Sequence, residues 1–281
     1  GAPELGLRGA ANASLVTNVL LYLFLCAYSA LARPLRSYTI LARLWRPDWE
    51  AFGQVFRLGL PIVLTMLAES GLFTPSAFMM GWISEEALAV HGIALQITAA
   101  TFMIHLGLSS AATVRAGHAW GQKDPVNLRK GAWAALVLSL AMVGITVALF
   151  LSIPELLIGL FLDPAEPARD RLIAMGAGLL AMAALFQLAD AVQVMALGFL
   201  RGVQDTKRPM VYAVISYWGI GVPASYVLGF TLGFGGLGIW LGMALGLSVA
   251  AITMMARFWR GPALNGGLVA SPPVTLPGRD A

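Results

Sequence analysis

Long apolar stretches alternate along the chain with short polar segments. A helix needs about 20 mostly apolar residues to cross the hydrocarbon core of a bilayer, and seven stretches are long enough. They lie near Ala10–Leu31, Leu58–Ile83, Leu88–Val114, Gly131–Ile153, Leu172–Leu200, Met210–Leu232 and Leu237–Ala256. The pattern predicts an all-α integral membrane protein with about seven transmembrane helices.

The composition agrees with this prediction. Hydrophobic residues make up 58% of the 281 residues and charged residues only 11%, whereas about a quarter of a soluble domain is charged. The mean hydropathy is +0.78. The single cysteine, Cys26, excludes an intrachain disulfide. Because the chain starts at Gly1 and not at a methionine, we expect it to be part of a longer protein.

The distribution of positive charge predicts the orientation of the spans. Fifteen of the 18 basic residues follow the first, third, fifth or seventh span. Cytoplasmic loops are the ones enriched in Lys and Arg, so the N-terminus is predicted to be outside and the C-terminus cytoplasmic. Loops 32–56, 116–130 and 201–209 are then cytoplasmic.

Two segments are predicted to lie outside the spans, and prolines are predicted to kink some of the spans. The connector 32–56 is basic and partly amphipathic around Tyr38–Trp45, which favours a position on the membrane surface. The tail 261–281 is rich in Pro and Gly, which favours disorder. Prolines at positions 61, 75 and 223 fall inside spans, where proline commonly marks a kink.

A short internal similarity suggests two related halves. Leu5–Ala11 resembles Leu237–Ala244, and each segment opens a span. Many transporters contain such repeats. On this interpretation residues 1–31 are the last helix of a first lobe, 32–56 a cytoplasmic connector between the lobes, 57–260 a six-helix second lobe and 261–281 a disordered tail.

Two carboxylates, Glu69 and Asp190, lie within predicted spans, and no Lys or Arg does. A charged group in the bilayer is costly and often marks an ion or proton pathway. Two carboxylates sharing a cavity cannot both stay charged cheaply, so either one takes a proton or a cation sits between them. The alternative is a buried polar cluster that only holds helices together.

Several neutral or titratable side chains are candidates to line the same site. Gln187, Asp190 and Gln193 are spaced three residues apart and therefore share one helical face. Further candidates are Gln96, Thr101, His105 and Phe186. Each can equally be a helix-to-helix contact, and a lone histidine is more often bonded to a neutral acceptor.

The sequence holds no known catalytic motif. It lacks a phosphate-binding glycine loop with Lys-Ser/Thr, a His-Glu-x-x-His pair and a Gly-x-Ser-x-Gly elbow. We therefore expect no enzymatic activity and no transport driven by ATP in this chain alone.

The sequence resembles the multidrug and toxic-compound extrusion (MATE) family, in its bacterial NorM-type branch. The segments that carry the resemblance are Phe56–Pro61 running on to Glu69, Val114–Gly117, Gln187–Gln193, Leu200–Thr206 with Pro209-Met210, and Tyr217-Trp218 with Pro223. The family has twelve helices in two lobes. The resemblance places this chain at the last helix of the first lobe plus the whole second lobe.

The resemblance implies export of small cationic, amphipathic drugs in exchange for Na⁺ or H⁺. It implies that Glu69 and Asp190 bind the coupling cation, as a metal site if the ion is Na⁺, with no other cofactor. It further implies a multi-pass protein of the bacterial inner membrane whose partners are lipid and the missing first lobe, not nucleic acid. Two departures stand out: Phe186 replaces a tyrosine of some relatives, and His105 replaces a usual proline.

Two other functions remain open on the sequence. A flippase of lipid-linked oligosaccharides belongs to the same superfamily but is expected to need a cationic cavity for its anionic substrate. A non-transporting membrane scaffold is the third possibility.

Overall fold

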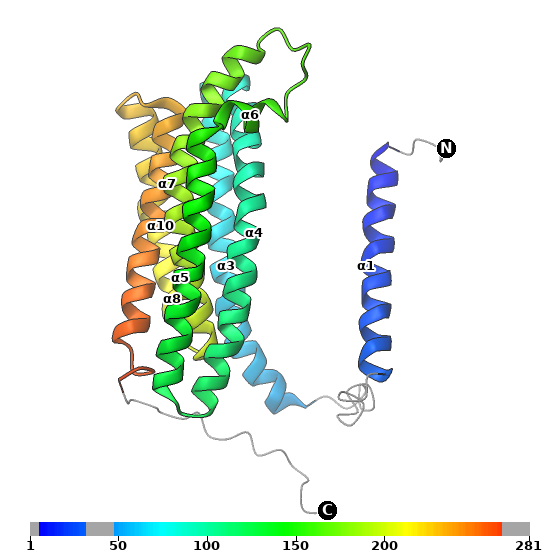
Figure 1. The fold of residues 1–281 in the computed structure, drawn as a ribbon, viewed down its shortest axis with the longest axis vertical. Helices are drawn as coiled ribbons and strands as arrows, with labels where there is room; N and C mark the ends of the chain where they lie inside the picture. Colours follow the sequence, from blue (N-terminus) through cyan, green and yellow to red (C-terminus); the bar gives the residue numbers. More distant parts are fainter. Residues whose placement is uncertain (1–5, 32–47, 266–281) are drawn as a thin grey trace, which may run out of the picture. The chain divides into compact units, whose positions relative to one another are not determined.

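The computed structural model describes residues 6–31 and 48–265, and their regular secondary structure is entirely helical (Figure 1). The chain divides into two compact units, 1–56 and 57–281. The first unit contains α1 (Gly6–Leu31) and the start of α3. The second contains the helices around the candidate site.

The helices of the second unit follow one another through short turns. They are α3 (Trp49–Ile83, which begins in the first unit), α4 (Glu85–Gly121), α5 (Pro125–Ser152), the short α6 (Pro154–Gly159), α7 (Arg169–Gly202) and α10 (Gly235–Arg260). Between α7 and α10 runs a composite helix made of α8 (Lys207–Val214), η1 (Ile215–Gly221), α9 (Val222–Tyr226) and η2 (Val227–Thr231). With α1, seven helices in the described residues are long and apolar enough to cross a membrane, which confirms the predicted number and class.

The helices extend beyond the predicted spans. α3 begins at Trp49, so the last part of the predicted connector is helical, and α4 continues to Gly121. Hydropathy marks the apolar part of a helix, whereas backbone hydrogen bonds continue into polar residues. The predicted surface segment around Tyr38–Trp45 and the tail beyond Asn265 lie outside the described residues.

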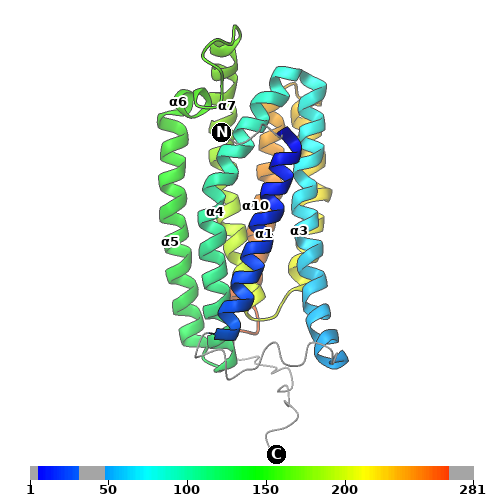
Figure 2. The ribbon, with the colours of Figure 1, turned by 90° about the vertical axis from the view of Figure 1, so that its right-hand side faces the viewer.

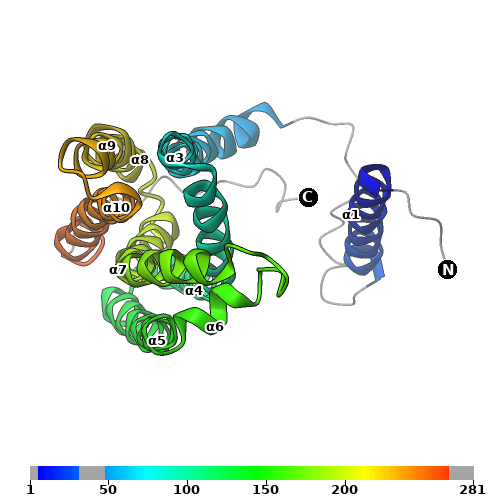
Figure 3. The ribbon, with the colours of Figure 1, turned by 90° about the horizontal axis from the view of Figure 1, so that it is seen from above.

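Helix α7 occupies the centre of the second unit. It packs against α4, α10 and α5, and Figure 3 shows it between them in an end-on view. The long helices α3, α4 and α5 run along a common direction (Figure 2). α7 is therefore the helix from which a side chain can face most of the others.

Close backbone contact joins α4 to α7. Ser109 Oγ donates to the carbonyl oxygen of Val194 at 2.7 Å, and Thr113 Oγ1 donates to that of Gly198 at 3.0 Å. A Cβ atom added to Gly202 would lie 2.7 Å from the carbonyl oxygen of Thr113. The absence of side chains at Gly198 and Gly202 permits this approach, so the backbones of the two helices lie in close contact.

The composite helix departs from α-helical geometry on both sides of Pro223. Its segments η1 and η2 are π-helical, a geometry that is rare and frequently found at functional sites. The predicted distortion at Pro223 thus takes the form of widened turns. In contrast, α3 continues as an α-helix through Pro61 and Pro75.

Side-chain caps set the start of α4 and of α5. Ser84 Oγ accepts a hydrogen bond from the backbone N–H of Ala87 at 3.0 Å. Asp124 Oδ1 accepts from the backbone N–H of Asn127 at 2.9 Å, and this bond holds the pKa of Asp124 below its usual value. Both caps satisfy amide groups that a helix start leaves without partners.

Candidate functional site

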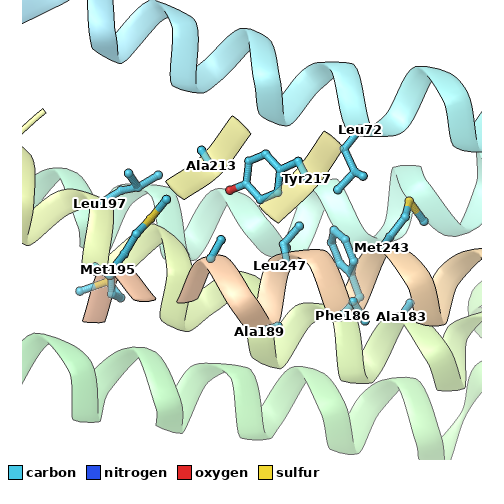
Figure 4. Close-up of a cluster of buried hydrophobic side chains, with 14 of the residues drawn as sticks. Leu72, Ala183, Phe186, Ala189, Met195, Leu197, Ala213, Tyr217, Met243 and Leu247 are labelled. Carbon is cyan, nitrogen blue, oxygen red and sulfur yellow. The ribbon is translucent and has the colours of Figure 1, made fainter. Parts of the chain in front are cut away.

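The polar face of α7 is buried inside the second unit. Gln187 and Gln193 are fully buried, and Asp190 is 5% exposed. Apolar side chains of α7 and α10 form a buried cluster in the same unit, and Figure 4 shows Phe186, Ala189, Met243 and Leu247 among them. The three polar side chains therefore share one buried face, as the spacing predicted.

Glu69 lies on α3, one turn before Phe73, whose ring packs against Phe186 of α7 with centroids 6.0 Å apart. Its side chain is half-buried. Neither carboxylate belongs to the two ion pairs found among the described residues, Arg171–Glu86 and Arg257–Asp205. α3 and α7 thus each carry one carboxylate that no basic side chain of the described residues contacts directly.

Arg201 modifies the interpretation of this pair. The sequence placed it in a cytoplasmic loop, but it lies in the last turn of α7, half-buried and within electrostatic range of Glu69. A half-buried basic group therefore lies on the same helix as Asp190, just beyond the predicted span. Because α7 continues past the apolar residues to Gly202, Arg201 is part of the helix.

In Gln187 and in Gln193 the amide nitrogen forms a hydrogen bond, whereas the amide oxygen forms none with the described residues. Gln187 Nε2 donates to Thr101 Oγ1 at 2.9 Å, and Gln193 Nε2 donates to the hydroxyl of Tyr217 at 2.6 Å. The Oε1 atoms of both glutamines are buried without a hydrogen-bond partner among the described residues. Leaving a buried acceptor unpaired costs about 1–3 kcal/mol, so these oxygens are available to a ligand.

Tyr217 was not among the residues singled out as site candidates. It lies on η1, is fully buried, and its hydroxyl accepts the hydrogen bond from Gln193, three residues after Asp190 on α7. Its only signal in the sequence is its place beside Trp218 in a segment that carries the family resemblance. A tyrosine in an apolar run is otherwise read as core.

Three sequence candidates lie elsewhere or have other contacts. Gln96 is exposed on α4. His105 is fully buried between α4 and α5, where its Nδ1 lies 2.9 Å from Ser139 Oγ. Phe186 packs edge-on against Phe73 and Trp240, with ring centroids 6.0 and 5.6 Å apart.

A second histidine, His91, is bonded on both ring nitrogens. Its Nδ1 accepts from the indole N–H of Trp240 at 3.1 Å, and its Nε2 lies 3.4 Å from Ser76 Oγ. These bonds join α3, α4 and α10. His91 is a structural link that the sequence analysis missed.

A cavity of about 730 Å³ lies between α3 and the composite helix. It is lined by Gly71, Thr74, Pro75, Phe78, Met79, Trp82, Trp218, Val222, Pro223, Tyr226 and Val227. None of the predicted site residues lines it. Nor does any group of three or more His, Cys, Asp or Glu side chains suited to a metal ion occur in the described part of the chain. Any metal here would depend on two carboxylates and neutral oxygens.

Comparisons with known proteins agree with the fold. The MatE family model matches residues 61–227. The chain is 42% identical over 261 residues to a "Probable multidrug resistance protein NorM" of Agrobacterium fabrum, covering 92% of this chain and 56% of that protein. It is 43% identical over 260 residues to a protein of the same description from Rhizobium meliloti, with the same two coverages.

Solved structures show the same architecture. The crystal structure of the eukaryotic MATE transporter AtDTX14 superimposes with a TM-score of 0.81 at 20% identity, covering 94% of this chain and 58% of that one. An outward-facing multidrug resistance MATE transporter gives 0.78 at 23% identity, covering 95% and 58%. The chain thus spans little more than half the length of the relatives and structures that it matches.

Proposed function

The chain belongs to the MatE family, and from this premise we propose that it forms the second lobe of a cation-coupled antiporter that exports cationic, amphipathic compounds. The family assignment agrees with the sequence resemblance. Export, substrate class and coupling ion are proposals, because the chain spans about half of its curated relatives.

One observation carries the proposal: α3 and α7, which meet through Phe73 and Phe186, each carry a carboxylate, Glu69 and Asp190, in largely apolar surroundings and outside the ion pairs of the described residues. Two such charges repel each other, so a proton or a cation between them is favoured. A cationic drug is favoured by the same negative charge. Drug and coupling ion therefore compete, and binding of one promotes release of the other.

Arg201 limits how strongly the site attracts a cation. Its guanidinium is within electrostatic range of Glu69, so an arriving cation meets a positive charge already present. We infer that Asp190 is the principal attracting group and that Glu69 is partly compensated. A site that binds too strongly would not release its ion, so this compensation suits exchange.

Arg201 is also the one observation that supports the flippase alternative. A flippase for an anionic lipid-linked sugar would need cationic groups, and Arg201 is a half-buried one. Glu69 offsets that charge, and Asp190 adds a negative charge on the same helix. The net balance of the carboxylates and Arg201 favours a cationic substrate.

For localisation we propose the bacterial inner membrane, with the C-terminus cytoplasmic. Basic residues cluster at one end of the helices of the second unit: Lys123, Arg129 and Lys130 at the turn between α4 and α5, Lys207 and Arg208 at the start of α8, and Arg257 and Arg260 at the end of α10. Positive residues favour the cytoplasmic side.

The test is transport of a fluorescent cation in proteoliposomes. Vesicles with the full-length transporter that contains this lobe should expel the dye when a sodium or proton gradient is applied. Vesicles with residues 1–281 alone should not, because alternating access moves one repeat against the other. Movement of an anionic lipid-linked sugar in place of the dye would support the flippase alternative.

A further inference from the structure

We propose that the start of α5 and the end of α10 together bind the headgroup of an anionic phospholipid. The positive charges come from Arg129, Lys130 and Arg260, and the paired indoles of Trp133 and Trp259 lie between the two helices. We call these five residues the headgroup site. The inference goes beyond the proposed function, because it concerns the membrane around the second unit and not the exported compound.

The indole pair joins α5 to α10. Trp133 of α5 packs against Trp259 of α10 with ring centroids 5.1 Å apart. Both helices pack against α7 but not closely against each other, so the pair bridges them at this end. Trp259 also packs edge-on against Phe258 at 5.3 Å, and Phe258 packs against Phe199 of α7 at 4.9 Å. These two phenylalanines are fully buried, so they fix the position of Trp259 from the interior.

The indole N–H groups of this pair have no acceptor among the described residues, where only Trp218 and Trp240 donate an indole hydrogen bond. Trp133 is 52% exposed, and Trp259 is partly exposed. A tryptophan at the boundary of a bilayer keeps its ring among the lipid and directs its N–H to polar atoms. Two indole donors can therefore reach the phosphate or ester oxygens of a lipid.

Three basic side chains flank the indole pair. Arg129 and Lys130 precede Trp133 by four and three residues, so all three share one face of α5. Arg260 follows Trp259 directly at the end of α10. The three basic side chains are exposed, and none of them forms an ion pair within the described residues. Basic residues at such a position attract anionic lipid headgroups.

The acidic side chains that the described part of the second unit carries at this end, Asp124 and Asp205, have other partners. Asp124 accepts hydrogen bonds from the backbone and the side-chain amide of Asn127, at 2.9 and 2.6 Å. Asp205 Oδ2 accepts from Nε of Arg257 at 2.9 Å. Arg257 lies two residues before Trp259, so it is on another face of α10. The headgroup site therefore keeps a net positive charge.

The side chains next to the indole pair are apolar and exposed, which suits acyl chains. Val137 follows Trp133 by four residues and is 58% exposed. Ile252 precedes Trp259 by seven residues and is 68% exposed. Each therefore continues the face of its indole toward the middle of the helix. Basic, aromatic and apolar side chains thus follow one another in the order of the headgroup, the glycerol region and the acyl chains of a phospholipid.

The experiment is native mass spectrometry of the purified full-length transporter that contains this lobe, titrated in non-ionic detergent with phosphatidylglycerol or with zwitterionic phosphatidylcholine. The first phosphatidylglycerol should bind about tenfold more tightly than the first phosphatidylcholine, because only its headgroup is negatively charged overall. The double variant Arg129→Gln/Lys130→Gln should weaken the phosphatidylglycerol Kd by about thirtyfold, equivalent to about 2 kcal/mol for two charges. Trp133→Phe removes one indole donor and should weaken this Kd by about threefold to tenfold.

The matched control is Lys207→Gln/Arg208→Gln, which removes two exposed positive charges from the same end of the second unit. These residues begin α8, which packs against η1 and α10, and α5 lies on the other side of α7 (Figure 3). The control should keep the phosphatidylglycerol affinity of the unaltered protein. Both double variants should keep its unfolding midpoint, because all four replaced side chains are exposed.

Equal loss of affinity in the two double variants would overturn the headgroup site, because the attraction would then belong to the whole basic end. Equal Kd values for the two lipids in the unaltered protein would overturn the choice of an anionic headgroup. Glycerol 1-phosphate carries a negative charge without acyl chains. Displacement of bound phosphatidylglycerol by millimolar glycerol 1-phosphate would overturn the lipid in favour of a soluble anion. None of these results depends on dye efflux, so the proposed function is tested separately.

Discussion

Trp240 on α10 donates its indole N–H to Nδ1 of His91 on α4, at 3.1 Å. The bond fixes the neutral tautomer of His91, because a nitrogen that accepts a hydrogen bond cannot carry the proton. Nε2 is then the donor and points to Ser76 Oγ on α3, at 3.4 Å, while Ser76 Oγ donates to the carbonyl oxygen of Phe73 at 2.7 Å. Three helices are joined by one neutral network.

Trp240→Phe should destabilise the second unit by about 1–3 kcal/mol, because Nδ1 of the 1% exposed His91 would lose its donor. Thermal unfolding in detergent measures the loss. Trp133→Phe, at a 52% exposed position, should change little. Adding His91→Leu to Trp240→Phe should recover part of the stability, since the stranded nitrogen is then removed. A double variant as unstable as the sum of the two singles would show that the network contributes nothing as a pair.

The contact of α4 with α7 leads to a second prediction. Gly202→Ala would place a Cβ atom 2.7 Å from the carbonyl oxygen of Thr113, and backbone cannot move aside easily. Overpacking of this kind costs about 1–3 kcal/mol, so the unfolding midpoint should fall. Gly107→Ala on α4 is the control, because nothing lies within 4 Å of its added Cβ. Equal midpoints for the two variants would mean that the helices can separate at little cost.

The orientation can be tested with single cysteines in a Cys26→Ser background. Lys130 and Lys207 are exposed at one end of the second unit, and Glu155 and Glu166 are exposed in or beside the segment that contains α6. Cysteines at 155 and 166 should react with an impermeant thiol reagent in intact cells. Those at 130 and 207 should react only after the membrane is opened. The reverse labelling would contradict a cytoplasmic C-terminus.

The fold followed from hydropathy because a bilayer demands long apolar helices, and all seven predicted spans are helices in the structure. Helix ends were less predictable. α3 starts at Trp49 and α7 keeps Arg201, since helical hydrogen bonds do not stop where the apolar residues do. The π-helical turns around Pro223 also had no sequence signal beyond the proline itself.

The candidate site was only partly predictable for a related reason. Asp190 and its two glutamine neighbours share a face because helical spacing fixes it, and a charge in a span is conspicuous. Tyr217 and His91 are neutral side chains within apolar runs, so their polar atoms become visible only when partners on other helices are in place. The contact of Tyr217 with Gln193 joins positions 24 residues apart in the chain, which no local pattern encodes.

The central claim is that Glu69 and Asp190 couple ion movement to export, and efflux measured against pH and sodium tests it most directly. In proteoliposomes of the full-length transporter, Glu69→Gln and Asp190→Asn should each reduce ion-coupled efflux of a fluorescent cation by at least tenfold, while their unfolding midpoints change much less. Asp190→Asn should be the more severe, since Arg201 already compensates Glu69 in part. The double variant should show no dependence on either gradient. Efflux in the double variant with the same pH and sodium dependence as the unaltered transporter would show that the two carboxylates are only structural.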